Sequence, residues 1–353
     1  MRMHRSESLL ISVLSIALAG VGAAQEMMEP KPHAEMAKFD ALIGAWEGEG
    51  VYREDAAGQP MPWKAVMVYS RILSGFAVQE DLVIDVGAPT KLTMRNVYGI
   101  DQGSGDSLAL GLSNQGQASL MDWAFPSADK FIVFGADRTQ MGIAVGRTVL
   151  SIGKDGLTMA HEGCRDAGKY FTEVEGKFKR MASAPELGEH PAFVGTEVSA
   201  EMKAMMGMGG KWNVAGTMVM APGMDAMPIK GTETSVALFG GHAVFSSTVG
   251  DGPDGQPAYF GHTYTVWNPV RKRYDVIGFD TMGMVMRQTG LWAEPGKTFV
   301  VTGISLWMGT LNAQSATMHL NEHGIERVVA HALANGQPSY ECFNAKYVKA
   351  NGN

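Results

Sequence analysis

One sequence pattern occurs twice in this chain. Residues 34–46 and residues 200–212 both read Ala-Glu-Met, then seven residues, then Gly-x-Trp, and no gap is needed to align them. The offset between the copies is 166 residues at this pattern and 169 residues between Lys177 and Lys346. Such a slow drift is expected where surface loops gain a residue or two. A repeat this long indicates one duplicated domain and not a solenoid of small repeats.

The ends of the chain and a proline-containing segment suggest the domain boundaries. Residues 1–25 combine a basic start, an apolar stretch too short for a comfortable membrane span and small residues near the end, which predicts a secretory signal peptide. We expect the first domain at residues 32–181, a linker at residues 182–198 and the second domain at residues 199–350. The protein is then exported to the periplasm or the extracellular space, and no segment stays in a membrane.

Each copy shows a short helix pattern followed by many short runs of alternating apolar residues, separated by Gly, Asn and Asp turns. This pattern predicts an all-β fold of eight to ten antiparallel strands per copy, either a sandwich or a barrel. The Gly-x-Trp at the first strand, Gly44 with Trp46 and Gly210 with Trp212, favours a barrel. We expect each indole to pack across the barrel floor. A basic residue of the last strand is expected to stack over it, Lys177 or Lys179 in the first copy and Lys346 or Lys349 in the second.

The helix and Gly-x-Trp opening resembles that of the calycin superfamily, which includes the lipocalins and the fatty-acid-binding proteins. Within it, residues 264–292 of the second copy are most similar to the bacterial family called domain of unknown function 1579, through a strand, a turn, and then Asp280-Thr281-Met282-Gly283. The first copy lacks that last motif at residues 113–116. The resemblance implies two tandem calycin-like, or lipocalin-like, antiparallel β-barrels, but it implies no particular activity.

Charge and motifs exclude several function classes. The net charge of −7 and the scattered basic residues argue against nucleic acid as a partner. No Gly-x-Ser-x-Gly, His-Glu-x-x-His or phosphate-loop motif is present, so no sequence motif predicts an enzyme. Two cysteines, Cys164 and Cys342, do not make a disulfide scaffold. A bridge between them and a pair of free thiols both stay open.

Two cofactor hypotheses deserve a test. Residues 47–52 are similar to the opening of nitrobindin-like haem proteins, but the alternation of glycines is shorter, and the last histidine, His331, lies before the final strand and makes a poor axial ligand. The 25 methionines gather in the second copy, and thioethers bind Cu(I). Methionine also fills irregular apolar interiors, and no His or Cys accompanies the clusters. We therefore expect no cofactor and no metal.

The second copy offers the better candidate binding site. His262, Tyr264 and Val266 alternate on one expected strand, and Asp280, Met282 and Met284 follow on the next strand face. If both faces point inward, His262, Tyr264 and Asp280 are polar anchors in an apolar cavity lined by the two methionines. A one-residue slip of the alternation would put these side chains on the other face.

These observations favour an exported protein that binds a small, mainly apolar molecule in one or both barrels. The first alternative is an enzyme that acts on such a molecule, with His262 and Asp280 as acid and base. The second is a structural or interaction scaffold whose barrels are filled by their own side chains, or a copper-binding protein.

Overall fold

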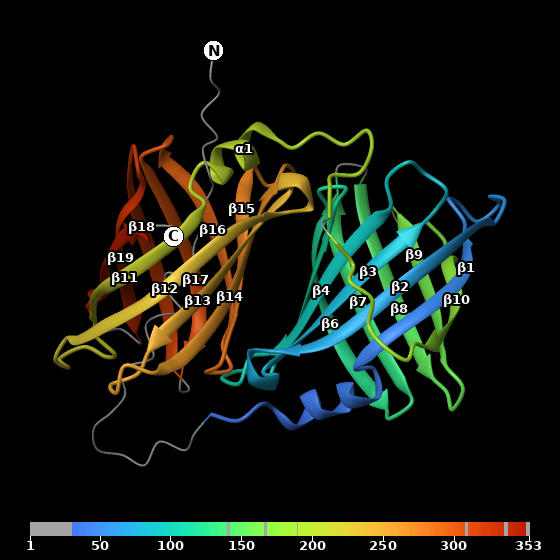
Figure 1. Cartoon of the computed structure of the whole chain (residues 1–353), viewed down its shortest axis with the longest axis horizontal. Helices are drawn as coiled ribbons and strands as arrows, with labels where there is room; N and C mark the ends of the chain where they lie inside the picture. The colour runs from blue at the N-terminus through green and yellow to red at the C-terminus, as the bar shows by residue number, and fades with distance from the viewer. Residues whose placement is uncertain are drawn as a thin grey trace. The chain divides into compact units, whose positions relative to one another are not determined.

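The structure is a computed structural model that describes residues 30–139, 142–165, 168–188, 190–307, 310–334 and 338–350. The expected signal peptide, residues 1–25, lies outside these residues. Twenty antiparallel strands form two closed barrels of ten strands each within the described part of the chain (Figure 1). A short helix precedes each barrel. The expected all-β pair of closed antiparallel barrels, each opened by a short helix, is confirmed, and the matching strand order fits a tandem duplication.

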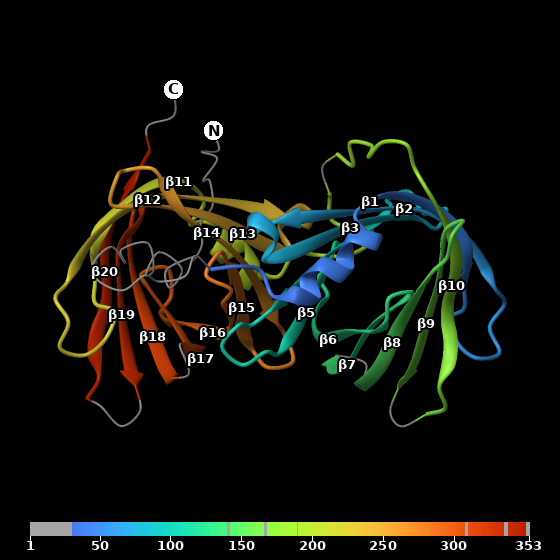
Figure 2. The ribbon, with the colours of Figure 1, turned by 90° about the horizontal axis from the view of Figure 1, so that it is seen from below.

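Barrel 1 begins with a 3₁₀ helix, η2 (Ala34–Ala41), which Figure 2 shows lying across one end of the barrel. Each strand pairs with the next one along the chain, and β1 closes the ring by pairing with β10. The strands are β1 (Gly44–Tyr52), β2 (Met61–Ile72), β3 (Ala77–Asp85), β4 (Leu92–Ile100), β5 (Ser107–Ser113), β6 (Ala118–Ser127), β7 (Lys130–Thr139), β8 (Gly142–Ile152), β9 (Leu157–Arg165) and β10 (Phe171–Arg180).

Barrel 2 repeats this order after helix α1 (Ala200–Met206), whose N-terminus is capped by the Ser199 side chain. Strand β11 closes the ring by pairing with β20. The strands are β11 (Gly210–Met218), β12 (Met227–Leu238), β13 (Ala243–Asp251), β14 (Pro257–Asn268), β15 (Arg273–Asp280), β16 (Val285–Glu294), β17 (Thr298–Trp307), β18 (Thr310–Asn321), β19 (Gly324–Ala334) and β20 (Tyr340–Lys349).

The Gly-x-Trp motif has the same geometry in both barrels. Gly44 has φ +120° and Gly210 has φ +139°, a backbone conformation that favours glycine, and both tryptophans are buried two residues later. The indole N–H of Trp46 donates a hydrogen bond of 2.8 Å to the carbonyl of Leu42, so it ties the strand to the end of η2.

The expected lysine over the first indole is wrong. Lys177 is exposed and pairs in register with Glu49, and the guanidinium carbon of Arg180 lies 4.3 Å from the centre of the Trp46 ring. Arg180 also donates hydrogen bonds to the carbonyls of Ala41 and Ile43 at the end of the helix. Lys177 and Lys179 lie on the outward face of β10, on either side of the buried Phe178, whereas Arg180 pairs in register with Trp46 on the inward face. Arginine suits this place because it can stack and donate at once.

Lys346 is also exposed, so it does not stack over Trp212. Lys349, the alternative candidate, pairs in register with Trp212, and its side chain lies close to Gly210. The indole N–H of Trp212 has no hydrogen-bond acceptor among the described residues. The two motifs therefore share backbone geometry but differ in how the indole is held.

Both helices close one end of their barrel with apolar side chains. Phe39 of η2 packs against the rings of Tyr98, Trp123, Phe125 and Phe131, with ring centres 5.0–5.3 Å apart. In barrel 2 methionines take this role, since Met202, Met205 and Met208 are all buried in the core. Unbranched side chains adapt to such a lid, as the helical spacing predicted.

Candidate functional site

Two of the residues expected to line barrel 2 lie on its outer face. The core side chains of β14 are Tyr259, Thr263 and Thr265, so His262 and Tyr264 point away from the interior. Tyr264 packs on the outside against the rings of Phe245 and Phe279. The prediction that His262 and Tyr264 anchor an interior ligand is wrong, because the face of β14 that was expected to point inward points outward.

Asp280 does point inward, as the last residue of β15. One carboxylate oxygen accepts hydrogen bonds from the backbone N–H of Met282 (2.9 Å) and of Met284 (3.0 Å), and the other lies 3.3 Å from the Tyr259 hydroxyl. Asp280 thus holds the turn that follows the strand. Since His262 lies on the opposite face, the pair cannot act together as acid and base.

The methionines of this region lie on a turn and not along one strand. Met282 and Met284 follow the end of β15, while Met286 is on β16. Met284 and Met286 are buried in the barrel 2 core, and Met282 is half-buried beside it. The turn folds their side chains into the end of the barrel.

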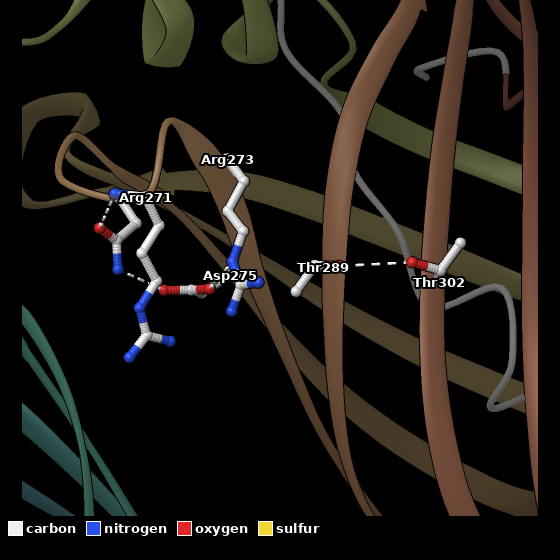
Figure 3. Close-up of polar contacts among 6 residues, drawn as sticks. Arg271, Arg273, Asp275, Thr289 and Thr302 are labelled. Carbon is white, nitrogen blue, oxygen red and sulfur yellow. Dashed lines mark hydrogen bonds and ion pairs between the residues drawn. The ribbon is translucent and has the colours of Figure 1, made fainter.

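The hairpin that carries these residues is fixed at its other end by polar contacts (Figure 3). The Asn268 side chain accepts a hydrogen bond from the backbone N–H of Arg271 and donates one to Asp275. Arg273 forms a salt bridge of 3.2 Å with Asp275, and the Thr289 and Thr302 hydroxyls lie 3.3 Å apart on the neighbouring strands. The contacts of Asn268, Arg273 and Asp275 stabilise the turn, and the threonine pair joins β16 to β17.

The inward-facing layer far from the helix differs between the barrels. In barrel 1 Tyr52, Met121, Met159 and Val174 are half-buried. The equivalent residues of barrel 2 are all buried: Met218, Gln288, Val328 and Phe343. Side chains that face the inside of a barrel are exposed only through its end. Barrel 1 therefore has an open end, opposite η2, and barrel 2 is filled at the same level.

A buried carboxyl group lies deeper in barrel 1. Glu80, which is 5% exposed, accepts hydrogen bonds from the Tyr98 hydroxyl and from the Asn96 amide at 2.9 Å. Burial raises the pKa of Glu80, and the hydrogen bonds from Tyr98 and Asn96 partly oppose this shift. Burial also raises the pKa of Tyr98 and of Tyr69, both next to this carboxyl group.

A second polar group lies nearer the open end. The Thr148 hydroxyl is 2.9 Å from Nδ1 of His161, and Nε2 of His161 is 3.7 Å from a carboxyl oxygen of Glu173. The side chains of His161 and Glu173 are 35% and 17% exposed. Burial lowers the pKa of His161, and the charges of Glu173 and Glu162 oppose this shift. We call Thr148, His161 and Glu173 the polar triad.

Glycines give the polar triad and its neighbour Trp63 their space. A Cβ atom at Gly146 would lie 3.1 Å from the His161 ring, and one at Gly176 would lie 2.4 Å from the Trp63 ring. Trp63 therefore lies flat across β1 and β10, at the level of Met159. It is 4% exposed, and its indole N–H has no acceptor among the described residues.

The fold itself does not require the polar triad. At the equivalent positions barrel 2 has Ala316, Ala330 and Cys342. Its own buried carboxyl group, Glu233, sits on a different strand, within 3.5 Å of the Tyr347 and Ser235 hydroxyls. The polar triad is thus particular to barrel 1, and we take the open end of barrel 1 as the candidate site.

Sequence reasoning missed this site. His161 and Glu173 are 12 positions apart on neighbouring strands, and the bulge at Glu173 breaks the alternation that would have placed it. One signal was present in the sequence: where the two copies align, Thr148 and His161 of the first copy stand opposite Ala316 and Ala330 of the second copy.

The described residues contain no group of three or more His, Cys, Asp or Glu side chains that could hold a metal ion. His331 is exposed on β19 and pairs in register with Ser315, so it does not face the interior. Both cysteines are free. Cys342 is near the core of barrel 2, where burial raises the pKa of its thiol to about 11.

No family model matches the chain, and no curated protein matches its sequence. Solved structures with a related shape include Rv2717c from M. tuberculosis (10% identity, 43% of this chain, 99% of that chain, TM-score 0.34). They also include the S-type phycobiliprotein lyase CPES from Guillardia theta (12%, 43%, 100%, 0.30) and a DUF3598 protein of unknown function from Nostoc punctiforme (10%, 90%, 100%, 0.26). At these scores and identities the matches say nothing about what this chain binds.

Proposed function

We propose that this protein binds a small, mainly apolar molecule inside barrel 1, through the end opposite η2. The observation that carries the proposal is the half-buried layer of Tyr52, Met121, Met159 and Val174, whose equivalents in barrel 2 are buried. A barrel open at one end and lined by apolar side chains with a few polar groups is the usual form of a small-molecule site.

The roles of the barrels therefore differ from the expectation. Barrel 2, which the sequence favoured, supports the scaffold alternative better, since Tyr259, Met284 and Met286 fill its interior. Barrel 1 supplies both an opening and a polar group below it. The duplicated chain then combines a binding barrel with a filled one.

The test is to block the open end. Met121 faces inward beside Gly111 and Gly135, and its neighbour Asp122 is exposed on the outer face of the same strand. We expect the neutral fluorescent probe N-phenyl-1-naphthylamine to bind the full chain at one site. Met121→Trp should weaken this binding at least about tenfold, and Asp122→Trp should not change it. Equal binding by both variants, or no binding by the unmodified protein, would refute the proposal.

A second candidate function is catalysis on the bound molecule. The contact of Thr148 with one ring nitrogen of His161, and the carboxyl group near the other, match the arrangement in which a neutral histidine accepts a proton from a hydroxyl. If the protein is such an enzyme, His161→Gln should abolish turnover of the bound molecule while the variant still binds the probe. Loss of turnover and of probe binding together would favour a binding role alone.

Export and family remain proposals of the same kind. A secretory signal at residues 1–25 and an exported, periplasmic or extracellular protein are supported by the sequence of that segment. Within the described residues, no helix has the length and hydrophobicity needed to cross a membrane. The similarity to the domain of unknown function 1579 family is supported only by the motif around Asp280.

A further inference from the structure

We infer that the molecule bound by barrel 1 carries a neutral hydroxyl head, as an alcohol or a phenol does, and that the barrel disfavours carboxylates. This inference rests on the proposed binding function and specifies its ligand. It follows from the hydrogen-bonding groups near the open end and from the carboxyl group of Glu173 among them.

One polar group near the open end, the Glu173 carboxyl group, can accept a hydrogen bond from a ligand. The carboxyl group of Glu173 is 17% exposed, and its nearest partner is Nε2 of His161 at a long 3.7 Å. Because Nε2 faces a carboxyl group, the tautomer with the proton on Nε2 is favoured, and Nδ1 then accepts the Thr148 hydroxyl proton at 2.9 Å. Glu173 keeps acceptor capacity for a donor brought by the ligand, and a hydroxyl proton would supply it.

One donor in the same part of the barrel has no acceptor. The indole N–H of Trp63 is buried and unpaired among the described residues. A buried donor without an acceptor is costly, and a ligand oxygen within reach would remove that cost. A hydroxyl group both donates and accepts. An ammonium group could donate to Glu173 but could not accept from Trp63.

The carboxyl group of Glu173 opposes an anion at the open end. Arg53 and Arg147 lie on the outside, in salt bridges with Glu175 and Glu162. A bound carboxylate close to Glu173 would be repelled by this carboxyl group.

The experiment compares ligands that differ only in their head group. Dodecanol, dodecylamine and dodecanoate are titrated against the full chain carrying N-phenyl-1-naphthylamine, and displacement of the probe is measured. We expect dodecanol to bind at least about tenfold more tightly than dodecanoate, and more tightly than dodecylamine. Dodecanoate binding as tightly as dodecanol, or dodecylamine binding most tightly, would overturn the inference.

Two variants assign the effect to named residues. Glu173→Gln should raise the affinity for dodecanoate about tenfold, because it removes the repelling charge, whereas Glu175→Gln on the outer face should change nothing. Trp63→Phe should lower the affinity for dodecanol at least about threefold more than it lowers the affinity for the probe. An unchanged ratio of dodecanol to dodecanoate affinity in Glu173→Gln would overturn the inference. If the probe binds but all three ligands compete equally, only the head-group inference fails; if nothing binds, the proposed function fails with it.

Discussion

The two Gly-x-Trp motifs allow the contribution of one buried hydrogen bond to be isolated. Trp46 and Trp212 occupy equivalent buried positions, but only Trp46 donates its indole N–H to an acceptor, the carbonyl of Leu42. Trp→Phe keeps an aromatic ring and removes a similar volume at either site. The difference between Trp46→Phe and Trp212→Phe therefore reports the hydrogen bond, together with any change in the stacking of Arg180 on the ring at position 46.

The magnitude follows from what each substitution leaves behind. Trp46→Phe leaves the carbonyl of Leu42, a fully buried residue, without its donor, which costs about 1–3 kcal/mol beyond the packing loss. Trp212→Phe removes an N–H that has no acceptor among the described residues, so it adds no such cost. We expect barrel 1 to lose about 1–3 kcal/mol more in the first variant than barrel 2 loses in the second.

Hydrogen–deuterium exchange, followed peptide by peptide in the full chain, gives the opening free energy of each barrel separately. Trp46→Ala and Trp212→Ala provide the scale, because loss of the whole indole should cost about 3–5 kcal/mol in either barrel. If the two Trp→Phe variants lose the same free energy within about 0.5 kcal/mol, the bond to Leu42 does not stabilise barrel 1 and the reasoning is wrong.

Three further predictions concern other residues. Burial raises the pKa of Glu80 above its ordinary 4.5. Between the unfolded pKa and the raised folded pKa, the folded chain keeps a proton that the unfolded chain has released, so barrel 1 loses stability as the pH rises through this range. Glu80→Gln should therefore stabilise barrel 1 more at pH 7 than at pH 5 in urea unfolding, and an equal gain would contradict this. Asp280→Ala should destabilise barrel 2 by at least about 1–3 kcal/mol, because three donors lose their acceptor, and Asp280→Asn should cost less in the same exchange measurement. The double substitution Met282→Leu with Met284→Leu should cost less than about 1.5 kcal/mol, and Cu(I) titration against a chelator should show no stoichiometric site in the unmodified protein; a site lost in the double variant would show that the methionines bind copper.

The sequence determined the duplication, the fold class and the place of each motif. Period-two runs bounded by turn residues specify strands locally, and the ungapped match around Trp46 and Trp212 specifies that both copies start alike. Alternation also placed Asp280 on the inward face of its strand, β15. These features are predictable because they depend on residues close together in the chain.

The tertiary structure decided which face of each strand points inward, and this reversed the choice of site. His262 and Tyr264 alternate as regularly as an inward-facing set would, and only pairing with β13 and β15 shows that they lie outside. The same register places Arg180 over Trp46, where a lysine was expected. The polar triad depends on β8, β9 and a bulge in β10, so its residues meet only when the barrel closes. Sequence alternation carries the period of a strand but not its phase, and the phase is fixed by partners that are distant in the chain.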